Sequence, residues 1–225
     1  MPENNKKRIL AFMVCCAPFF LNDLANIFLY RNYMAWLAVD YVFVKAFLLG
    51  FIFYLLRKKI ITFEDLGLKA IKLPEFLFWT VLMIIAGLFL DQIGGRFWAS
   101  VIPGTALGKF PVIANPALYR LDLYLGLFFV GFTEEIIFRG LAFRVLYENF
   151  KSLPKVFIIS SLIFGLIHWS LGINVIINTA IIGAVFMIAL WRTKSVWPLI
   201  IAHFIVDYVA FSGLIPEKGL TRILH

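Results

Sequence analysis

Seven long apolar stretches separated by short polar segments constrain the fold of this chain more than any other feature. They cover approximately residues 9–30, 33–56, 75–91, 121–147, 156–171, 173–191 and 196–213. A transmembrane α-helix needs about 20 mostly apolar residues, and in lipid only helices and closed barrels satisfy all their backbone polar groups. The pattern therefore predicts an all-α fold, a polytopic transmembrane helix bundle of about seven spans.

The charge content excludes the common alternatives to a membrane protein. Only 15% of the 225 residues are charged and 62% are apolar, whereas soluble domains carry about 25% charged residues. Although the net charge is +8, so few charges do not suit a soluble fold, a disordered tail or a nucleic-acid module. We expect the lipid bilayer, and no nucleic acid, as a partner. The length favours a single membrane domain over residues 1–225.

The distribution of basic residues predicts the orientation of the bundle. With the N-terminus inside, twelve Lys and Arg fall in inner segments, and six fall in outer ones: Arg31, Arg96, Lys109, Arg120, Lys218 and Arg222. Because cytoplasmic loops carry the excess of positive charge, we expect the N-terminus inside. The first apolar run reaches Tyr30 without a small-residue cleavage site, which indicates an uncleaved span. The expected location is the plasma or inner cell membrane, with multiple passes.

Three connecting segments have recognisable signals. Residues 92–120 contain several glycines and prolines and are expected to form an irregular external connection. A tight helical hairpin is expected around Gly172. In the connection 57–74, Thr62 followed by Asp65 suggests a helix start in which each side chain caps the other residue's backbone.

A few ionisable residues lie inside the apolar stretches, where each is costly and is therefore a functional candidate. The fourth stretch reads Phe132-Thr-Glu134-Glu135-Ile-Ile-Phe-Arg139, the fifth ends Phe164-Gly-Leu-Ile-His168, and the seventh contains His203-Phe-Ile-Val-Asp207. With a rise of 1.5 Å per residue, Glu134, His168 and Asp207 are expected roughly 17–20 Å from the inner surface and His203 about 10 Å. The three stretches thus bring polar groups to overlapping depths.

The spacing within these stretches suggests different roles. Glu135 and Arg139 are four residues apart in the favourable order for an ion pair on one helix face, and we expect them to be structural. Glu134 is left without a local partner and is a candidate general base. Glu134 with His168 could hold and deprotonate a water that attacks a carbonyl, and His203 with Asp207 could face the resulting oxyanion.

Two other catalytic routes are considered, one through a covalent nucleophile and one through a metal ion. No serine or cysteine is as well placed as a nucleophile, so a covalent route is less favoured. One carboxylate and two histidines, Glu134, His168 and His203, resemble a catalytic zinc ligand set, although the HExxH signature is absent. We expect that no cofactor is required, and zinc is the alternative.

These motifs, in this order on late membrane spans, resemble the CAAX-protease and bacteriocin-processing family of intramembrane endopeptidases, which includes the Rce1-type prenyl-protein proteases and the Abi proteins. The resemblance covers residues 120–213, the expected catalytic core, and leaves residues 1–119 as N-terminal spans and external connection. It implies Glu134 as catalytic base, His168 as its partner on the water, and His203 and Asp207 at the oxyanion positions. Family members often carry Asn where this chain has Asp207, and a carboxylate donates to an oxyanion only when protonated. The family is often labelled metalloprotease, yet the glutamate mechanism needs no metal.

Other polar residues in the spans have structural interpretations. Asp23, Asp40 and Lys45 are expected to join the first two helices, and Asn174 and Asn178 to form interhelical hydrogen bonds.

The leading hypothesis is an endopeptidase that cleaves a membrane protein or peptide in or near the bilayer. The main alternative is a non-enzymatic membrane immunity or scaffold protein with the same fold. A small proton-coupled transporter is less favoured, because the chain shows no internal repeat.

Overall fold

The computed structural model describes residues 3–214, and Lys218 and Arg222, which were expected on the outer side, lie outside this range together with His225. The described chain folds into seven helical rods without strands. Their elements, in chain order, are α1 (Glu3–Phe28); α2 (Tyr33–Ala38), η1 (Val39–Ala46) and α3 (Phe47–Arg57); α4 (Leu73–Phe89), η2 (Leu90–Gly94) and α5 (Gly95–Val101); α6 (Pro116–Leu121), η3 (Asp122–Gly126), α7 (Leu127–Glu134), η4 (Glu135–Leu141) and α8 (Ala142–Phe150); α9 (Leu153–Leu166) with η5 (Trp169–Leu171); α10 (Ile173–Thr193); and α11 (Trp197–Phe211). The all-α prediction is confirmed.

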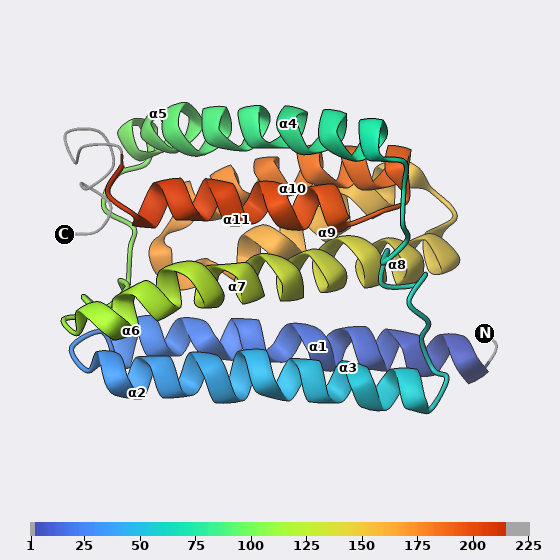
Figure 1. Ribbon diagram of the computed structural model, residues 1–225, viewed down its shortest axis with the longest axis horizontal. Helices are drawn as coiled ribbons and strands as arrows, with labels where there is room; N and C mark the ends of the chain where they lie inside the picture. Colours follow the sequence, from blue (N-terminus) through green and yellow to red (C-terminus); the bar gives the residue numbers. More distant parts are fainter. Residues whose placement is uncertain (1–2, 215–225) are drawn as a thin grey trace.

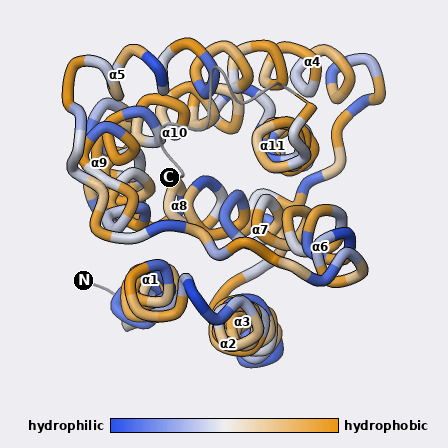
Figure 2. The backbone as a smooth tube through the Cα atoms, turned by 90° about the vertical axis from the view of Figure 1, so that its left-hand side faces the viewer, coloured by the Kyte–Doolittle hydropathy of each residue, from blue (hydrophilic) through white to orange (hydrophobic). Residues whose placement is uncertain are grey.

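The rods run roughly parallel to the long axis of the molecule (Figure 1). Viewed along that axis, α1 and the α2–α3 rod form one edge and the α4–α5 rod the opposite edge (Figure 2). The α6–α8 rod lies between these edges, with α9 and α10 on one side and α11 on the other. The rods that carry the candidate site residues are therefore the inner ones.

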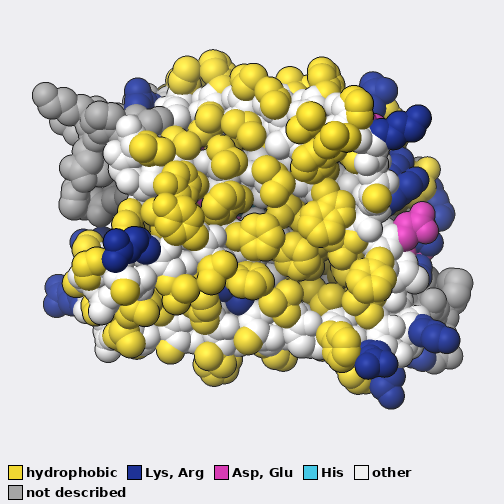
Figure 3. Space-filling view, in the orientation of Figure 1, with side chains coloured by type: hydrophobic (Ala, Val, Ile, Leu, Met, Phe, Trp, Pro, Cys, Tyr) yellow, Lys and Arg dark blue, Asp and Glu magenta, His cyan; other side chains and the backbone are white. Residues whose placement is uncertain are grey.

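The surface of the bundle is that of a membrane protein. Large apolar side chains such as Phe43, Phe78 and Ile85 are more than half exposed, and apolar side chains cover the middle of the face in Figure 3. Lys and Arg gather mainly at the end where the N-terminus lies. Soluble monomers rarely expose apolar patches of this extent. Four described helices are long and apolar enough to cross a membrane: Asn5–Phe28, Tyr33–Arg57, Leu73–Val101 and Ile173–Thr193.

The helix ends follow from local sequence. Proline occupies the first turn of α4, α6, α9 and α11, where its missing N–H costs nothing. The Asn115 side chain caps α6 by accepting from the backbone N–H groups of Ala117 and Leu118. Lys151 and Lys194 end α8 and α10 in the left-handed conformation. Gly172, with a φ of 111°, forms the expected tight turn between α9 and α10, because this backbone region favours glycine.

The expected external connection is shorter than residues 92–120. The third rod continues through Gly94 and Gly95 to Val101, and irregular chain occupies only residues 102–115. The two glycines are tolerated because they allow the rod to approach α10: a Cβ on Gly94 would lie 2.7 Å from Asn178 Oδ1. The glycines are thus packing positions in a helix rather than loop positions.

Four π-helical segments each carry one or two charged residues, of which Asp40, Lys45, Glu135 and Arg139 are buried. Asp40 and Lys45 lie in η1, Asp91 in η2, Asp122 in η3, and Glu135 with Arg139 in η4. Asp40 and Lys45 are five residues apart, a spacing that brings side chains together in the i→i+5 pattern of a π-helix but not in an α-helix. Their side chains are in contact.

The turn around Leu66 and Gly67 links two helices that carry candidate site residues. Thr62 and Asp65 make the two expected reciprocal bonds, at 2.9 and 3.2 Å, although they open a turn and not a helix. A Cβ on Gly140, in η4, would overlap the Leu66 carbonyl oxygen. The Gly67 carbonyl accepts from the Val196 N–H at 2.9 Å, just before α11. We call residues 62–67 the clamp turn.

The first helix packs directly on the fourth and fifth rods. The rings of Phe19 and Phe138 meet edge to face at 5.1 Å, and the Trp169 indole N–H donates to the Phe20 carbonyl at 3.1 Å. Cys15 and Cys16 are free and buried here, as expected of packing residues.

Candidate active site

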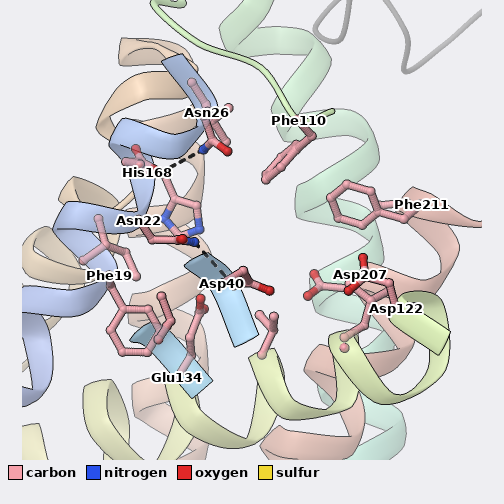
Figure 4. A pocket seen from close by; sticks show the side chains of 18 of the residues that line it. Phe19, Asn22, Asn26, Asp40, Phe110, Asp122, Glu134, His168, Asp207 and Phe211 are labelled. Atoms are coloured by element: carbon pink, nitrogen blue, oxygen red, sulfur yellow. Dashed lines mark hydrogen bonds between the residues drawn. The ribbon is translucent and has the colours of Figure 1, made fainter. Parts of the chain in front are cut away.

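A cavity of about 600 Å³ lies inside the bundle. Its wall includes Glu134, His168, His203 and Asp207, the four residues expected to be catalytic. Figure 4 shows Glu134 and His168 on one side of this space and Asp207 on the other, with Asp40 between them. The four candidates come from three rods, so the fold brings together what the sequence separates by more than 70 residues.

The His203 ring lies among three carboxylates. Its Nδ1–H donates to Glu135 Oε1 at 2.8 Å, because a carboxylate can only accept. On the other edge of the ring, Nε2 lies 3.4 Å from Asp207 Oδ2 and 3.7 Å from Glu134 Oε2. Glu135 thus fixes the ring, and Nε2 is directed towards Glu134 and Asp207.

Glu135 also makes the expected ion pair with Arg139. Its second oxygen, Oε2, lies 3.3 Å from Arg139 Nε, and both side chains are almost wholly buried. The guanidinium lies 3.7 Å from the centroid of the Phe164 ring, a favourable cation–π position. Phe164, the first residue of the FxxxH motif, therefore packs against the guanidinium of the ion pair. This contact was not predicted from the sequence.

His168 lies just beyond the end of α9. Its Nδ1–H donates to the Phe164 carbonyl oxygen at 3.1 Å, and its ring meets the Phe164 ring edge to face at 5.4 Å. Because a carbonyl cannot donate, the proton must be on Nδ1 in the neutral ring. The Nε2 lone pair is then free to accept a hydrogen bond from a molecule in the cavity.

The expected depth of His203 was wrong relative to Glu134. His203 was expected several ångströms nearer to the inner surface, yet its ring contacts both Glu134 and Glu135. The reason is that α11 begins further inside the bundle than α8 ends (Figure 1). The clamp turn bonds to Val196 at the start of α11.

The polar residues of the first two rods are more than a structural link. The two rods are linked by Asn22 of α1, which was not expected there and donates to Asp40 Oδ1 at 3.4 Å. Asp23 instead accepts from the Ser170 backbone N–H at 2.6 Å. All three carboxylate and amide side chains, together with Lys45, line the cavity.

Three further polar residues of the cavity wall were missed or assigned otherwise by the sequence analysis. Asp91 was placed at the edge of a span, although it is a charge within a 29-residue apolar helix, which was the available signal. Asp122 accepts from the Tyr41 hydroxyl at 3.0 Å. Asn178, expected to bond between helices, has a buried Oδ1 without a hydrogen-bond partner. Each of the three lines the cavity.

The zinc alternative requires three donor side chains placed around one ion. Within residues 3–214, no three His, Cys, Asp or Glu side chains are placed to hold one metal ion together. Glu134, His168 and His203 therefore do not form a ligand set of the kind that catalytic zinc uses. We derive no step through a metal.

Residues 116–209 match the family model described as type II CAAX prenyl endopeptidase Rce1-like. The matched segment begins at α6 and ends within α11, so it includes every candidate catalytic residue. No curated protein and no solved structure matches the chain significantly.

Proposed function

We propose that this protein is an intramembrane endopeptidase, on the premise that residues 116–209 match the Rce1-like type II CAAX prenyl endopeptidase family. Its substrate is a membrane protein or a lipid-proximal peptide, and Glu134 activates the attacking water. The observation that carries the proposal is the convergence of Glu134, His168, His203 and Asp207 on one cavity.

The first step is the attack of water on the scissile carbonyl. Glu134 Oε2 has no hydrogen-bond partner and is free to accept a water proton. The His168 Nε2 lone pair accepts the second hydrogen of the same water. The water oxygen bonds to the carbonyl carbon, the proton passes to Glu134, and the carbonyl oxygen becomes an oxyanion.

His203 stabilises the oxyanion. The three carboxylates around its ring favour the positively charged imidazolium, and Glu135 holds Nδ1–H so that Nε2–H points into the cavity. When the tetrahedral intermediate collapses, the carbon–nitrogen bond breaks and Glu134 returns its proton to the amine. Glu134 is then ready for the next water.

Asp207 acts through His203 rather than as a direct donor. Its Oδ2 is 3.4 Å from His203 Nε2, a position from which a carboxylate orients the ring and favours its charged form. This assignment gives the Asp at this position a role that needs no proton on the carboxyl group.

We propose that the seven rods cross the plasma or inner cell membrane with the N-terminus inside. The concentration of Lys and Arg at the N-terminal end of the bundle supports this orientation, because basic residues favour the cytoplasmic side. Phe110, Val112 and Phe211, near the opposite end, line the cavity. Substrate then enters from the outer side.

The test is cleavage of a membrane-peptide library by purified protein in nanodiscs. Glu134→Gln keeps the shape of the side chain but removes its basicity, and should lower the rate by at least about a hundredfold. The matched control is Glu75→Gln, because Glu75 is an exposed residue in the first turn of α4. Equal rates for wild type and Glu134→Gln would overturn the mechanism. Absence of any cleavage, together with a protective phenotype that survives Glu134→Gln, would favour the immunity or scaffold alternative.

A further inference from the structure

We propose that the cavity selects a substrate segment with a basic side chain, so that a Lys or Arg of the peptide occupies the space bordered by Asp91, Asp122 and Asp207. The inference rests on the proposed function, because it names the substrate class of the same site. It is carried by the balance of charge and by the hydrogen-bonding groups of the cavity wall.

The cavity wall carries far more negative than positive groups. Six acidic residues line it, namely Asp23, Asp40, Asp91, Asp122, Glu134 and Asp207. Among the described residues of the wall, Lys45 is the one lysine or arginine, and it is in contact with Asp40. His203 offsets part of the charge of Glu134 and Asp207. The wall is otherwise mostly apolar, so the uncompensated charge is felt strongly by an occupant.

The partners of these carboxylates show where the charge remains uncompensated. Asp23 is bonded to a backbone N–H and to Asn26, and Asp40 to Lys45 and Asn22. Asp91 accepts from the neutral Gln92 amide at 2.7 Å, and Asp122 from the neutral Tyr41 hydroxyl. Asp122 and Asp207 both line the cavity, and Figure 4 labels both of them on the same side of it.

A second, independent observation concerns hydrogen bonds. Three buried side-chain atoms of wall residues lack a partner: Asn22 Oδ1, Glu134 Oε2 and Asn178 Oδ1. Asn178 and Glu134 are 94% and 93% buried, from exposed fractions of 6% and 7%. All three atoms are acceptors, and buried acceptors without donors are costly. Near the carboxylates, an occupant that brings N–H donors and a positive charge, as a guanidinium or an ammonium does, suits a wall rich in acceptors.

The same wall is poorly suited to a terminal carboxylate. Lys45 is engaged by Asp40, and Arg139 is buried against Glu135 and Phe164 outside the cavity wall. A carboxylate placed among Asp91, Asp122 and Asp207 would meet like charges. We therefore infer that this protein recognises a basic internal or N-terminal segment rather than the free C-terminus of its substrate.

The experiment measures binding without requiring cleavage. Purified protein in nanodiscs is titrated with n-octylguanidinium, and n-octanol and n-octanoate serve as probes of equal chain length. Thermal unfolding and calorimetry report binding. We expect saturable binding of octylguanidinium that Asp91→Asn with Asp122→Asn weakens by at least about tenfold. Both substitutions keep the oxygens that accept from Gln92 and Tyr41, and Glu75→Gln is the control for a lost charge.

Each remaining outcome decides the question. Equal binding of all three probes, or unchanged binding in the double variant, would overturn the proposal. If Ca²⁺ or Zn²⁺ competes at the same carboxylates and binds tightly alone, the ligand of this site is a metal ion and not a basic side chain. If peptides are cleaved, those with Lys should react faster than matched norleucine peptides. Charge-selective binding without cleavage would leave this inference standing while the proposed protease fails.

Discussion

His203 and Glu135 are joined across two helices by a 2.8 Å hydrogen bond from Nδ1–H to Oε1. The other oxygen of the same carboxylate faces Arg139, so one buried side chain both neutralises a cation and positions an imidazole. Because Glu135 contacts both groups, its contribution to stability and its contribution to catalysis can be measured separately.

We predict that Glu135→Met destabilises the protein by about 3–5 kcal/mol, because it leaves the Arg139 charge buried and unpaired. The double variant Glu135→Met with Arg139→Met should recover most of that stability, since no charge remains. Its proteolytic rate should stay low, because His203 has lost the acceptor that orients it. Thermal unfolding and cleavage are measured on the same samples. Recovery of both properties would show that Glu135 does not position His203.

The role of Asp207 is tested by comparing two substitutions. Asp207→Asn keeps an oxygen near His203 Nε2, and should retain activity within about tenfold of wild type, the cost of one weakened polar interaction. Asp207→Ala removes the acceptor and should lose about a hundredfold, a loss typical of a misplaced oxyanion donor. Steady-state rates decide between them. Similar losses in both variants would mean that the charge of Asp207, and not its position, is required.

A metal-independent mechanism predicts that activity survives exhaustive chelation. The protein would be treated with EDTA and 1,10-phenanthroline in nanodiscs, and its metal content measured by elemental analysis. We expect an unchanged cleavage rate in metal-free protein, because Glu134 is both base and acid in the proposed steps. Loss of activity on chelation, restored by stoichiometric zinc, would contradict this.

Gly140→Ala should destabilise the protein by about 3 kcal/mol, because the added methyl group overlaps the backbone of Leu66 and overpacking is costly. Gly50→Ala is the matched control: nothing lies within 4 Å of its Cβ position, and an Ala in a helix gains about 0.5–1 kcal/mol over Gly. Unfolding midpoints in detergent provide the comparison. Equal effects at the two positions would exclude the close approach to the clamp turn.

Much of the site was predictable because the chemistry is carried by charges in apolar helices. Glu134, His168, His203 and Asp207 stand out on hydropathy alone, and the i,i+4 spacing predicted the Glu135–Arg139 pair. The contact of His203 with Glu135 was not predictable, since it depends on how deeply α11 begins. A hydrogen bond between residues 67 and 196, which the sequence does not reveal, lies at the start of that helix.

The errors in the fold also have physical causes. Gly94 and Gly95 were interpreted as loop residues, but their missing side chains permit close packing of the third rod on α10. Asp91 was therefore placed at the end of a membrane helix, although this helix continues to Val101. In the π-helical segment η1, Asp40 and Lys45 lie on one face. A regular α-helix, with 3.6 residues per turn, would place them on different faces.

The clamp turn makes the matched segment dependent on the rest of the chain. Gly140, on the rod that carries Glu134, and Val196, just before the helix that carries His203, both contact residues between the second and third rods. During synthesis the ribosome completes the clamp turn before either helix exists. The helices that carry Glu134 and His203 thus both contact residues outside the matched segment, and residues 116–209 expressed alone would lack these contacts.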